Sequence, residues 1–238
     1  NDPSFVTQGD MFGAHGMSSH WADNFPVNAL AWAVDSRDPY VPLSEYTLFY
    51  SEKVIYATRE QKVAAAKRAY GSEKALDFLT FDDKAEVVKH LEERGCVKCS
   101  LVLCDNLVPM LMDQYTDEHQ GDLTIESKLY SAVTGIETSE DEMYVNGERI
   151  FNLERAIMVR EGRRRQQDQI APMFTVPRNK SIWYGTYEEG TTKEEGTFVD
   201  PDIFNTTFLD HWYSLMGWTN DGVPTRSKLE ELGMKDVA

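Results

Sequence analysis

Residues 138–161 read TSEDEMYVNGERIFNLERAIMVRE, and this stretch predicts a long helix with a clearly marked start. Hydroxyl side chains followed by three acidic residues are typical of a helix start, because the hydroxyl caps a free amide and the acids favour the positive end of the helix dipole. Apolar side chains then recur as a stripe, which predicts that the helix continues to about Glu161. The stripe consists of Met143, Ile150, Leu153, Ile157 and Val159, with Tyr144 and Phe151 nearby.

Helical patterns fill most of the chain on either side of this stretch. Apolar spacing and glycine or proline stops predict helices over 28–36, 44–70, 80–94, 100–112 with a kink near Pro109, 122–133, 201–216 and 227–232. In the helix that starts at Thr80, the residues expected on the solvent face are Lys84, Glu86, Lys89, Glu92 and Glu93. Strand patterns are few, so the predicted fold class is mainly α.

The chain divides into two unequal parts by composition. Residues 1–28 are rich in glycine, proline and scattered aromatics, and we expect them to be a loop-rich segment that ends a preceding domain. Residues 29–238 form one helical domain, interrupted by a polar, glycine-rich excursion over 162–200. The chain starts with Asn-Asp-Pro rather than Met, so we expect it to be a piece of a longer protein.

Charge and composition exclude some classes of partner. The 238 residues carry 40 acidic and 24 basic side chains, a formal net charge of -16, which repels nucleic acid and anionic membranes. No apolar run approaches the roughly 18 residues that span a bilayer. We therefore expect a soluble cytoplasmic protein.

All three cysteines lie within residues 96–104, in the sequence CVKCSLVLC. A closed zinc or iron–sulfur site needs four ligands, so three thiols are too few. Three interpretations remain open from spacing alone. Cys104 is a metal ligand or a buried structural cysteine, and Cys96 with Cys99 could chelate zinc as a CxxC pair if another segment completed the site.

Other polar residues are weaker candidates for a site. Asp35, Arg37 and Asp38 make a charged corner after an apolar segment, which suits either a cofactor contact or a salt-bridged helix end. His20 lies in the loop-rich start, where a ligand could approach. The basic run Arg163-Arg164-Arg165 is typical of a solvated face. No phosphate loop, nucleophile elbow or HExxH motif is present.

Four segments together resemble the C-terminal part of the aldehyde:ferredoxin oxidoreductase family. ALAWAVDSRD at 29–38 is similar to the family's ALAYATSxRG, and CSLVLC at 99–104 to its pterin-binding DxxGLC. Residues 130–162, which contain GERIFNLER, match the family's AVTGWDxTxEELxxxGERIxNLERxFNxREG almost residue for residue. Residues 211–234, HWYSLMGWTNDGVPTRSKLEELGM, resemble its YYxLRGWDxxGxPTxEKLEELGL. The resemblance covers residue 29 to the end, with a different loop at 178–200.

The resemblance implies a helical C-terminal domain that contributes to two cofactors. These are a 4Fe-4S cluster and a tungsten or molybdenum bis-pterin, and both require segments outside this chain. By this mapping Cys104 is the fourth cluster ligand, while Cys99 falls on the family's pterin-binding Asp and Val102 on its Gly. The implied cofactor contacts are Asp35, Arg37, Cys99, Ser100, Leu103 and Asp105, and the implied catalytic residues are His20, in place of a family histidine, and Asp38.

The implied activity is oxidation of aldehydes to carboxylates, with electrons leaving through the cluster to ferredoxin or another electron-transfer protein. The other expected partner is the N-terminal part of the enzyme, without which this chain is expected to be incomplete and inactive, and a homodimer is compatible with the sequence. Two alternatives stay open. One is a benzoyl-CoA reductase-type member of the same superfamily, and the other is a non-catalytic helical subunit that binds a partner and no cofactor.

Overall fold

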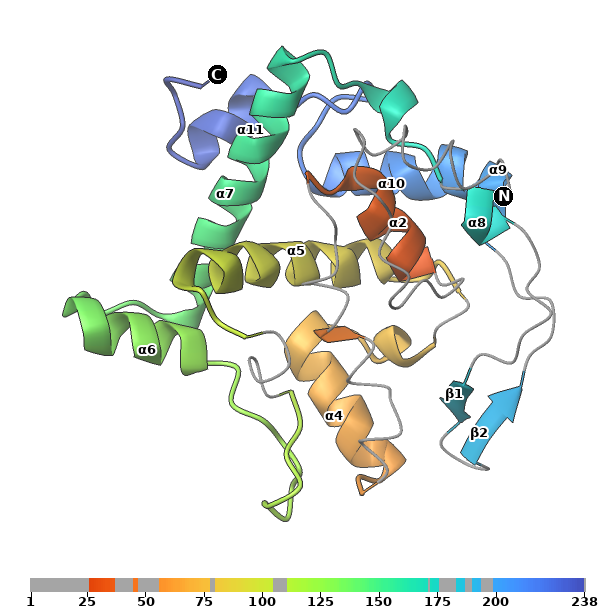
Figure 1. Cartoon of the computed structure of the whole chain (residues 1–238), viewed down its shortest axis with the longest axis vertical. Coiled ribbons are helices and arrows are strands. Elements are labelled where there is room, and N and C mark those ends of the chain that lie inside the picture. The colour runs from red at the N-terminus through yellow and green to blue at the C-terminus, as the bar shows by residue number, and fades with distance from the viewer. Residues whose placement is uncertain are drawn as a thin grey trace, which may run out of the picture.

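The structure is a computed structural model that describes residues 26–36, 45–46, 56–77, 80–104, 111–170, 172–175, 183–186, 190–193 and 199–237. Helices dominate these residues, as the sequence predicts (Figure 1). The α-helices are α2 (Pro26–Val34), α4 (Arg59–Tyr70), α5 (Lys84–Leu101), α6 (Ile125–Thr134), α7 (Glu140–Arg160), α8 (Pro172–Thr175), α9 (Pro201–Ile203), α10 (Leu209–Leu215) and α11 (Arg226–Glu231). One antiparallel pair, β1 (Trp183–Thr186) and β2 (Gly190–Lys193), lies within the polar excursion.

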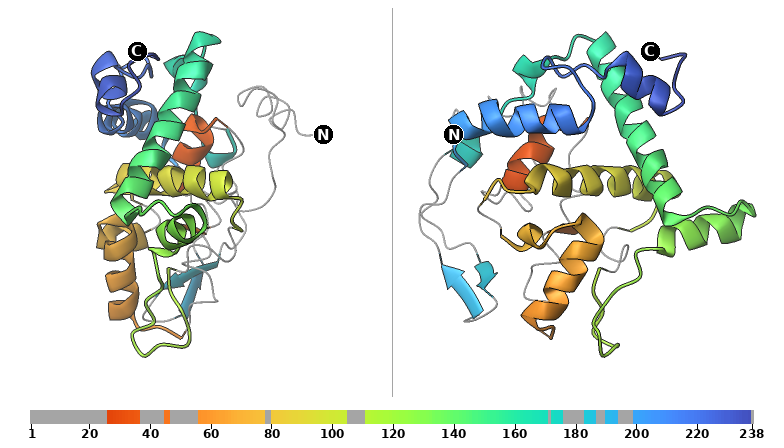
Figure 2. Two further views of the ribbon diagram at one scale, coloured as in Figure 1. Left: turned by 90° about the vertical axis from the view of Figure 1, so that its left-hand side faces the viewer. Right: turned by 180° about the vertical axis from the view of Figure 1, so that it is seen from behind.

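Helices α5 and α7 form the frame on which the other helices pack. In Figure 1, α5 runs across the middle of the molecule and α7 rises from one of its ends. Figure 2 shows the same crossing from two further directions. Helices α2 and α10 contact one side of α5, and α4 lies on the other. Every residue of α2 is buried, so this short apolar helix fills the centre of the core.

The crossing of α5 and α7 depends on Gly147. A Cβ atom at this position would lie 2.1 Å from the carbonyl oxygen of Glu93, far inside van der Waals contact. The absent side chain therefore lets the backbones of the two helices touch. One turn further along the same face of α7, Phe151 stacks on Trp218 and meets Trp212 edge-on.

Most predicted helix ends are confirmed. Ser139 caps α7, accepting a hydrogen bond from the Glu142 amide while the Glu142 carboxylate accepts one from the Ser139 amide. Gly71 and Gly135 end α4 and α6 in the left-handed conformation. The predicted helix over 201–216 is a continuous run made of α9, a π-helical turn (Phe204–Phe208) and α10.

Other local predictions are wrong. Gly95 does not end a helix, because α5 continues through it to Leu101 and carries Cys96 and Cys99. Residues 102–104 and 111–112 are not helical, and residues 56–58 interrupt the helix predicted over 44–70. Lys84, Glu92 and Glu93 are buried rather than on a solvent face. The stripe predicted on α7 also fails at Leu153 and Ile157, each 40% exposed, because α7 packs through Gly147, Phe151 and Arg155 instead.

None of the helices in the described ranges is long and apolar enough to cross a membrane. Residues 1–25 lie outside the described part of the chain, so the prediction for the loop-rich segment stays a prediction.

We expect Gly147→Ala to destabilise the fold although alanine favours helices. The new methyl group must push the α7 backbone away from Glu93, which costs roughly 2–3 kcal/mol of unfolding free energy. Asn146→Ala, at the neighbouring exposed position, is the control and should change stability by about 0.5 kcal/mol or less. Urea denaturation measures both. Equal stability of the two variants would contradict the close helix contact.

Candidate functional site

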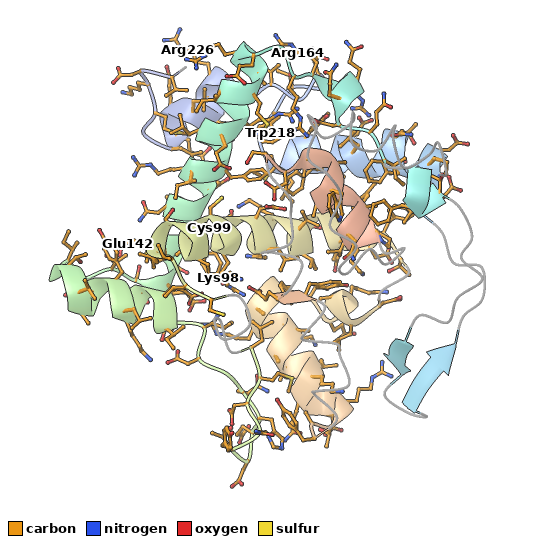
Figure 3. The ribbon with its side chains drawn as sticks, in the orientation of Figure 1. Lys98, Cys99, Glu142, Arg164, Trp218 and Arg226 are labelled. Atoms are coloured by element: carbon orange, nitrogen blue, oxygen red, sulfur yellow. The ribbon has the colours of Figure 1, made fainter. Side chains whose placement is uncertain are left out.

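The carboxyl end of α5 brings together several residues that the sequence singles out. Cys96 is buried, Cys99 is partly exposed and Cys104 is exposed, and none of the three forms a disulfide bond. Ser100 is exposed and donates a hydrogen bond to the Cys96 carbonyl, 2.8 Å away. Figure 3 shows Lys98 and Cys99 on this last turn of α5. A buried structural role for Cys104 is therefore wrong, and the CxxC pair lies along one helix.

The chain leaves α5 through a Schellman turn. The Leu103 amide donates to the Lys98 carbonyl at 2.9 Å, and the Val102 amide donates to the Cys99 carbonyl at 3.3 Å. Val102 adopts the left-handed conformation, with φ 56° and ψ 42°, and its side chain is 90% exposed. A β-branched residue is strained in this conformation, which glycine adopts freely. The strained position lies two residues before Cys104, directly after the helix.

A buried ion cluster fixes the same end of α5. We name it the Glu45 cluster: Glu45, Tyr70, Arg94 and Lys98. Glu45 accepts hydrogen bonds from Tyr70 at 3.1 Å and Lys98 at 3.2 Å, and pairs with Arg94. Burial opposes the charge of Arg94, yet Glu45 and the neighbouring tyrosine hydroxyls hold the pKa of its guanidinium above the usual value. Arg94 also donates to the Tyr144 hydroxyl, which ties the cluster to α7.

A second buried network joins α7 to α2 and α10. We name it the Asp168 hub: Asp168, Arg155, Arg163 and Tyr213. Arg155 binds the Asp168 carboxylate through both terminal nitrogens, at 2.9 and 2.5 Å, and Arg163 and Tyr213 donate to it at 2.8 and 2.7 Å. Arg155 also donates to the Gly222 carbonyl at 2.8 Å. Gly222 has φ 72°, and a Cβ there would lie 2.3 Å from the Arg155 guanidinium.

Arg163 of the basic run at 163–165 belongs to this network, and all three arginines are only partly exposed, so the prediction of a solvated face is wrong. Arg163 donates to the carbonyls of Ala33 and Asp35, at 2.7 and 2.9 Å, and thereby satisfies groups at the end of α2. Arg164 donates to the Val159 carbonyl at 2.7 Å near the end of α7. Arg165 pairs with Asp210 at 2.5 Å. The three arginines thus join neighbouring segments of the chain.

A groove with a volume of about 400 Å³ lies between α4, α5 and α7. Burial raises the pKa of Glu93 in its wall to about 7, against the opposing effect of Lys89. Burial, with the positive charges of Arg94 and Lys89, lowers the pKa of His90 to about 4. Glu148, also in the groove wall, pairs with Lys228 at 2.7 Å. The groove wall mixes both charges, which favours no single class of ligand.

The structure describes about half of the residues expected in the site. Asp35 is buried at the end of α2, and Cys99, Ser100, Leu103 and Cys104 share the carboxyl end of α5. His20, Arg37, Asp38 and Asp105 lie outside the described residues. Within the described ranges, no group of three or more His, Cys, Asp and Glu side chains could hold a metal ion. The expected roles of all these residues therefore remain predictions.

The sequence patterns did not predict the Glu45 cluster or the Asp168 hub. A signal for the first was available, because Arg94 and Lys98 are four residues apart and so lie on one face of α5 with Leu91 and Val87 nearby. No comparable signal marks Asp168, since Arg155 and Tyr213 lie 13 and 45 residues away from it in the sequence.

Comparison with known proteins gives one extensive match. The family described as aldehyde ferredoxin oxidoreductase, domains 2 & 3, matches residues 26–234. Among solved structures, the chain is similar to one described as the active site complex BamBC of benzoyl coenzyme A reductase in complex with 1,5 dienoyl-CoA. Identity to that chain is 21%, the TM-score is 0.45, and the match covers 68% of this chain and 20% of that one. This chain thus spans about a fifth of that protein.

Val102→Gly should stabilise the protein. Removing the strain of a left-handed valine should raise the free energy of unfolding by about 1–2 kcal/mol. The greater freedom of glycine in the unfolded chain lowers it by roughly 0.5–1 kcal/mol, so we expect a net increase of about 1 kcal/mol. Val145→Gly, on exposed helical backbone, is the matched control and should cost about 1 kcal/mol. Thermal and urea unfolding measure the two changes. A loss of stability in Val102→Gly would show that the left-handed turn is not strained.

Glu93 and His90 should give opposite pH dependences of stability. The pKa of Glu93 rises on folding from 4.5 to about 7. Its contribution to the stability of the folded state is therefore full below pH 4.5 and is lost as the pH rises to 7. The pKa of His90 falls from 6.5 to about 4, so its contribution is full above pH 6.5 and is lost as the pH falls to 4.

Two variants separate these contributions in urea titrations across this pH range. The free energy of unfolding of Glu93→Gln, minus that of the wild type, should increase from pH 4.5 to 7. The free energy of unfolding of His90→Gln, minus that of the wild type, should decrease from pH 4 to 6.5. Differences that do not vary with pH would show that neither side chain changes its pKa on folding.

Proposed function

The chain belongs to the aldehyde ferredoxin oxidoreductase family, and we propose that it is the helical part of a cytoplasmic tungsten- or molybdenum-pterin enzyme that oxidises aldehydes to carboxylates. The family match over residues 26–234 is the observation that carries this proposal. We further propose that residues outside this chain supply the rest of the enzyme, and that ferredoxin or a similar protein accepts the electrons. A homodimer is a further proposal.

The carboxyl end of α5 suits a cluster ligand. Cys104 is a free, exposed thiol on backbone that is held by the turn through Lys98 and Leu103. One such thiol fits one of the four ligand positions of a 4Fe-4S cluster. Since the described residues hold no group of three ligands, the other cysteines would come from elsewhere. Cys104 is therefore proposed as the single ligand from this part of the enzyme.

The cofactors would supply the two-electron chemistry at the metal and one-electron transfer through the cluster. This chain's own residues would hold and orient them. Cys104 would bind iron as a thiolate, and Cys99, Ser100, Leu103 and Asp105 are proposed to contact the pterin. A thiol at position 99 is a weaker hydrogen-bond acceptor than a carboxylate, so Cys99 offers the pterin a weaker contact than an Asp would.

The end of α2 is the second segment that we propose to contact the cofactor. Arg163 binds the Asp35 carbonyl and fixes the backbone from which Arg37 and Asp38 follow. Asp35 and Arg37 are proposed to orient the cofactor. His20 and Asp38 are proposed as the groups that move a proton during aldehyde oxidation.

Removing the proposed ligand should remove iron from the full-length enzyme. We expect Cys104→Ser to lower the iron content measured by elemental analysis, because a 4Fe-4S cluster needs all four thiolates to be held firmly. Cys96→Ala, at the buried thiol of the same helix, is the control and should keep the iron. If Cys104→Ser retained the full iron content, the ligand assignment would be wrong.

Substrate assays distinguish the proposed activity from its alternatives. The purified full-length enzyme should reduce a viologen dye when an aldehyde is added. Reduction of an aromatic acyl-CoA ring by reduced viologen, without aldehyde oxidation, would instead identify a ring reductase. Inactivity in both assays, with no metal in the native protein, would identify a non-catalytic helical subunit.

A further inference from the structure

Helix α6 carries apolar side chains on its outer side. Leu129, Val133 and Ile136 are 41%, 85% and 57% exposed, and Ala132 is exposed as well. Their spacing of three and four residues places them on one side of the helix, with Ile136 just after its end. We name these four residues the α6 face. Single exposed apolar side chains are normal on a protein surface, but a contiguous group of them indicates an interaction site.

The polar side of α6 is the side that packs against the rest of the molecule. Glu126 and Ser127 are buried, and they line a small cavity together with Arg94 and Val97 of α5. A helix on a free surface shows the opposite pattern, with its apolar side chains toward the core and its polar side chains toward water. The described segments therefore bury the polar side of α6 and leave its apolar side in solvent.

The α6 face is too small to hold a separate protein by itself. Helix α6 has 10 residues, and a helix of this length is about 15 Å long and about 10 Å wide. A stable complex of two separate proteins buries about 800 Å² on each partner, well above what one side of such a helix offers. A domain of the same polypeptide needs less area, because the covalent connection keeps it at a high effective concentration.

The charges around α6 favour a protein surface over a membrane. Helices that lie on anionic membranes carry several Lys or Arg residues on their polar side. Lys128, which borders the α6 face, pairs with Asp122 at 2.6 Å, and the net charge of the chain is -16. An apolar centre with a polar rim is instead typical of a contact between folded protein surfaces.

The position of α6 brings its partner close to the proposed cluster ligand. Helix α6 meets the last two turns of α5, shortly before the turn that leads to Cys104, and extends away from the other helices (Figures 1 and 2). The matched region of the family is described as its domains 2 & 3, so a complete family member has a further domain. Residues that complete a cluster at Cys104 must approach this same end of α5.

We propose that the α6 face is the docking surface for a further domain of the same polypeptide, whose own apolar side chains cover Leu129, Val133 and Ile136. This inference rests on the proposed function, in which residues outside this chain complete the enzyme. Removing the α6 face from water favours the docked arrangement in proportion to the apolar area that is buried. The contact holds the further domain beside the end of α5.

Thiol labelling of the full-length enzyme tests this contact. Val133→Cys places a thiol in the α6 face, and Arg226→Cys, at an exposed position of α11, is the control. In the native enzyme, we expect a maleimide to label position 133 at least about tenfold more slowly than position 226, because it reacts only when the domains separate. Peptide mass spectrometry distinguishes each position from the native cysteines. If Val133→Cys does not fold, Ala132→Cys replaces it.

A charge at position 133 gives a second measurement. Lysine suits the last turn of an exposed helix better than valine, because of its helix propensity and the helix dipole. We nevertheless expect Val133→Lys to lower the thermal unfolding temperature of the full-length enzyme by several degrees, because the docked domain buries the charge. Ile157→Lys, in the last turn of α7 and also exposed, is the matched control and should not lower it.

The possible outcomes separate this occupant from others. Equal native labelling rates at positions 133 and 226 would overturn the inference, and so would an unchanged or higher unfolding temperature in Val133→Lys. Protection of position 133 that disappears on dilution would identify a second copy of the protein instead. The proposed function fails separately, through a native enzyme without iron, tungsten or molybdenum, because neither measurement depends on metal content.

Discussion

The buried carboxylate of Asp168 is the interaction on which most of the structure depends. Its two oxygens bind Arg155 from α7, Arg163 from the following turn and Tyr213 from α10. Neither Asp168 nor Arg155 reaches solvent. Removing one partner of such a buried pair typically costs about 3–5 kcal/mol, because the remaining charge has lost both water and its counterion. Three separate segments therefore keep their relative positions through one side chain.

A continuous set of contacts leads from this carboxylate to the proposed ligand. The Asp168 hub orients α7, whose Gly147 rests directly against the Glu93 backbone of α5. Further along α5, Arg94 and Lys98 hold its end against Glu45. The Schellman turn then directs the chain to Cys104. The residues of GERIFNLER thus act as a structural support, with Gly147, Asn152 and Arg155 each making a specific contact to a neighbouring segment.

Sequence patterns predicted the parts of the fold that local chemistry determines. The capping residues at 139–142 and the glycines at 71 and 135 mark helix ends correctly, because each acts within one turn. Gly95 was wrongly predicted to end a helix, because glycine has a low helix propensity. Burial against neighbouring helices keeps α5 helical through this position. The burial of Glu92 and Arg155 could not be predicted either. Charged residues are normally exposed, and only long-range partners make their burial tolerable.

The candidate site was only partly predictable for the same reason. Resemblance to a family selected Cys104, but only the structure shows its thiol exposed beside a left-handed Val102 and a buried Lys98. The glycine that the resemblance places at position 102 would fit this turn, because the backbone there has positive φ. With valine in this turn, the backbone is strained two residues before the proposed ligand Cys104.

The sharpest test of the proposed function is a metal analysis of the full-length protein, purified in its native form without added metal. We expect tungsten or molybdenum together with about four irons per polypeptide, as a single 4Fe-4S cluster requires. A folded native protein that contains neither iron nor tungsten nor molybdenum would contradict it.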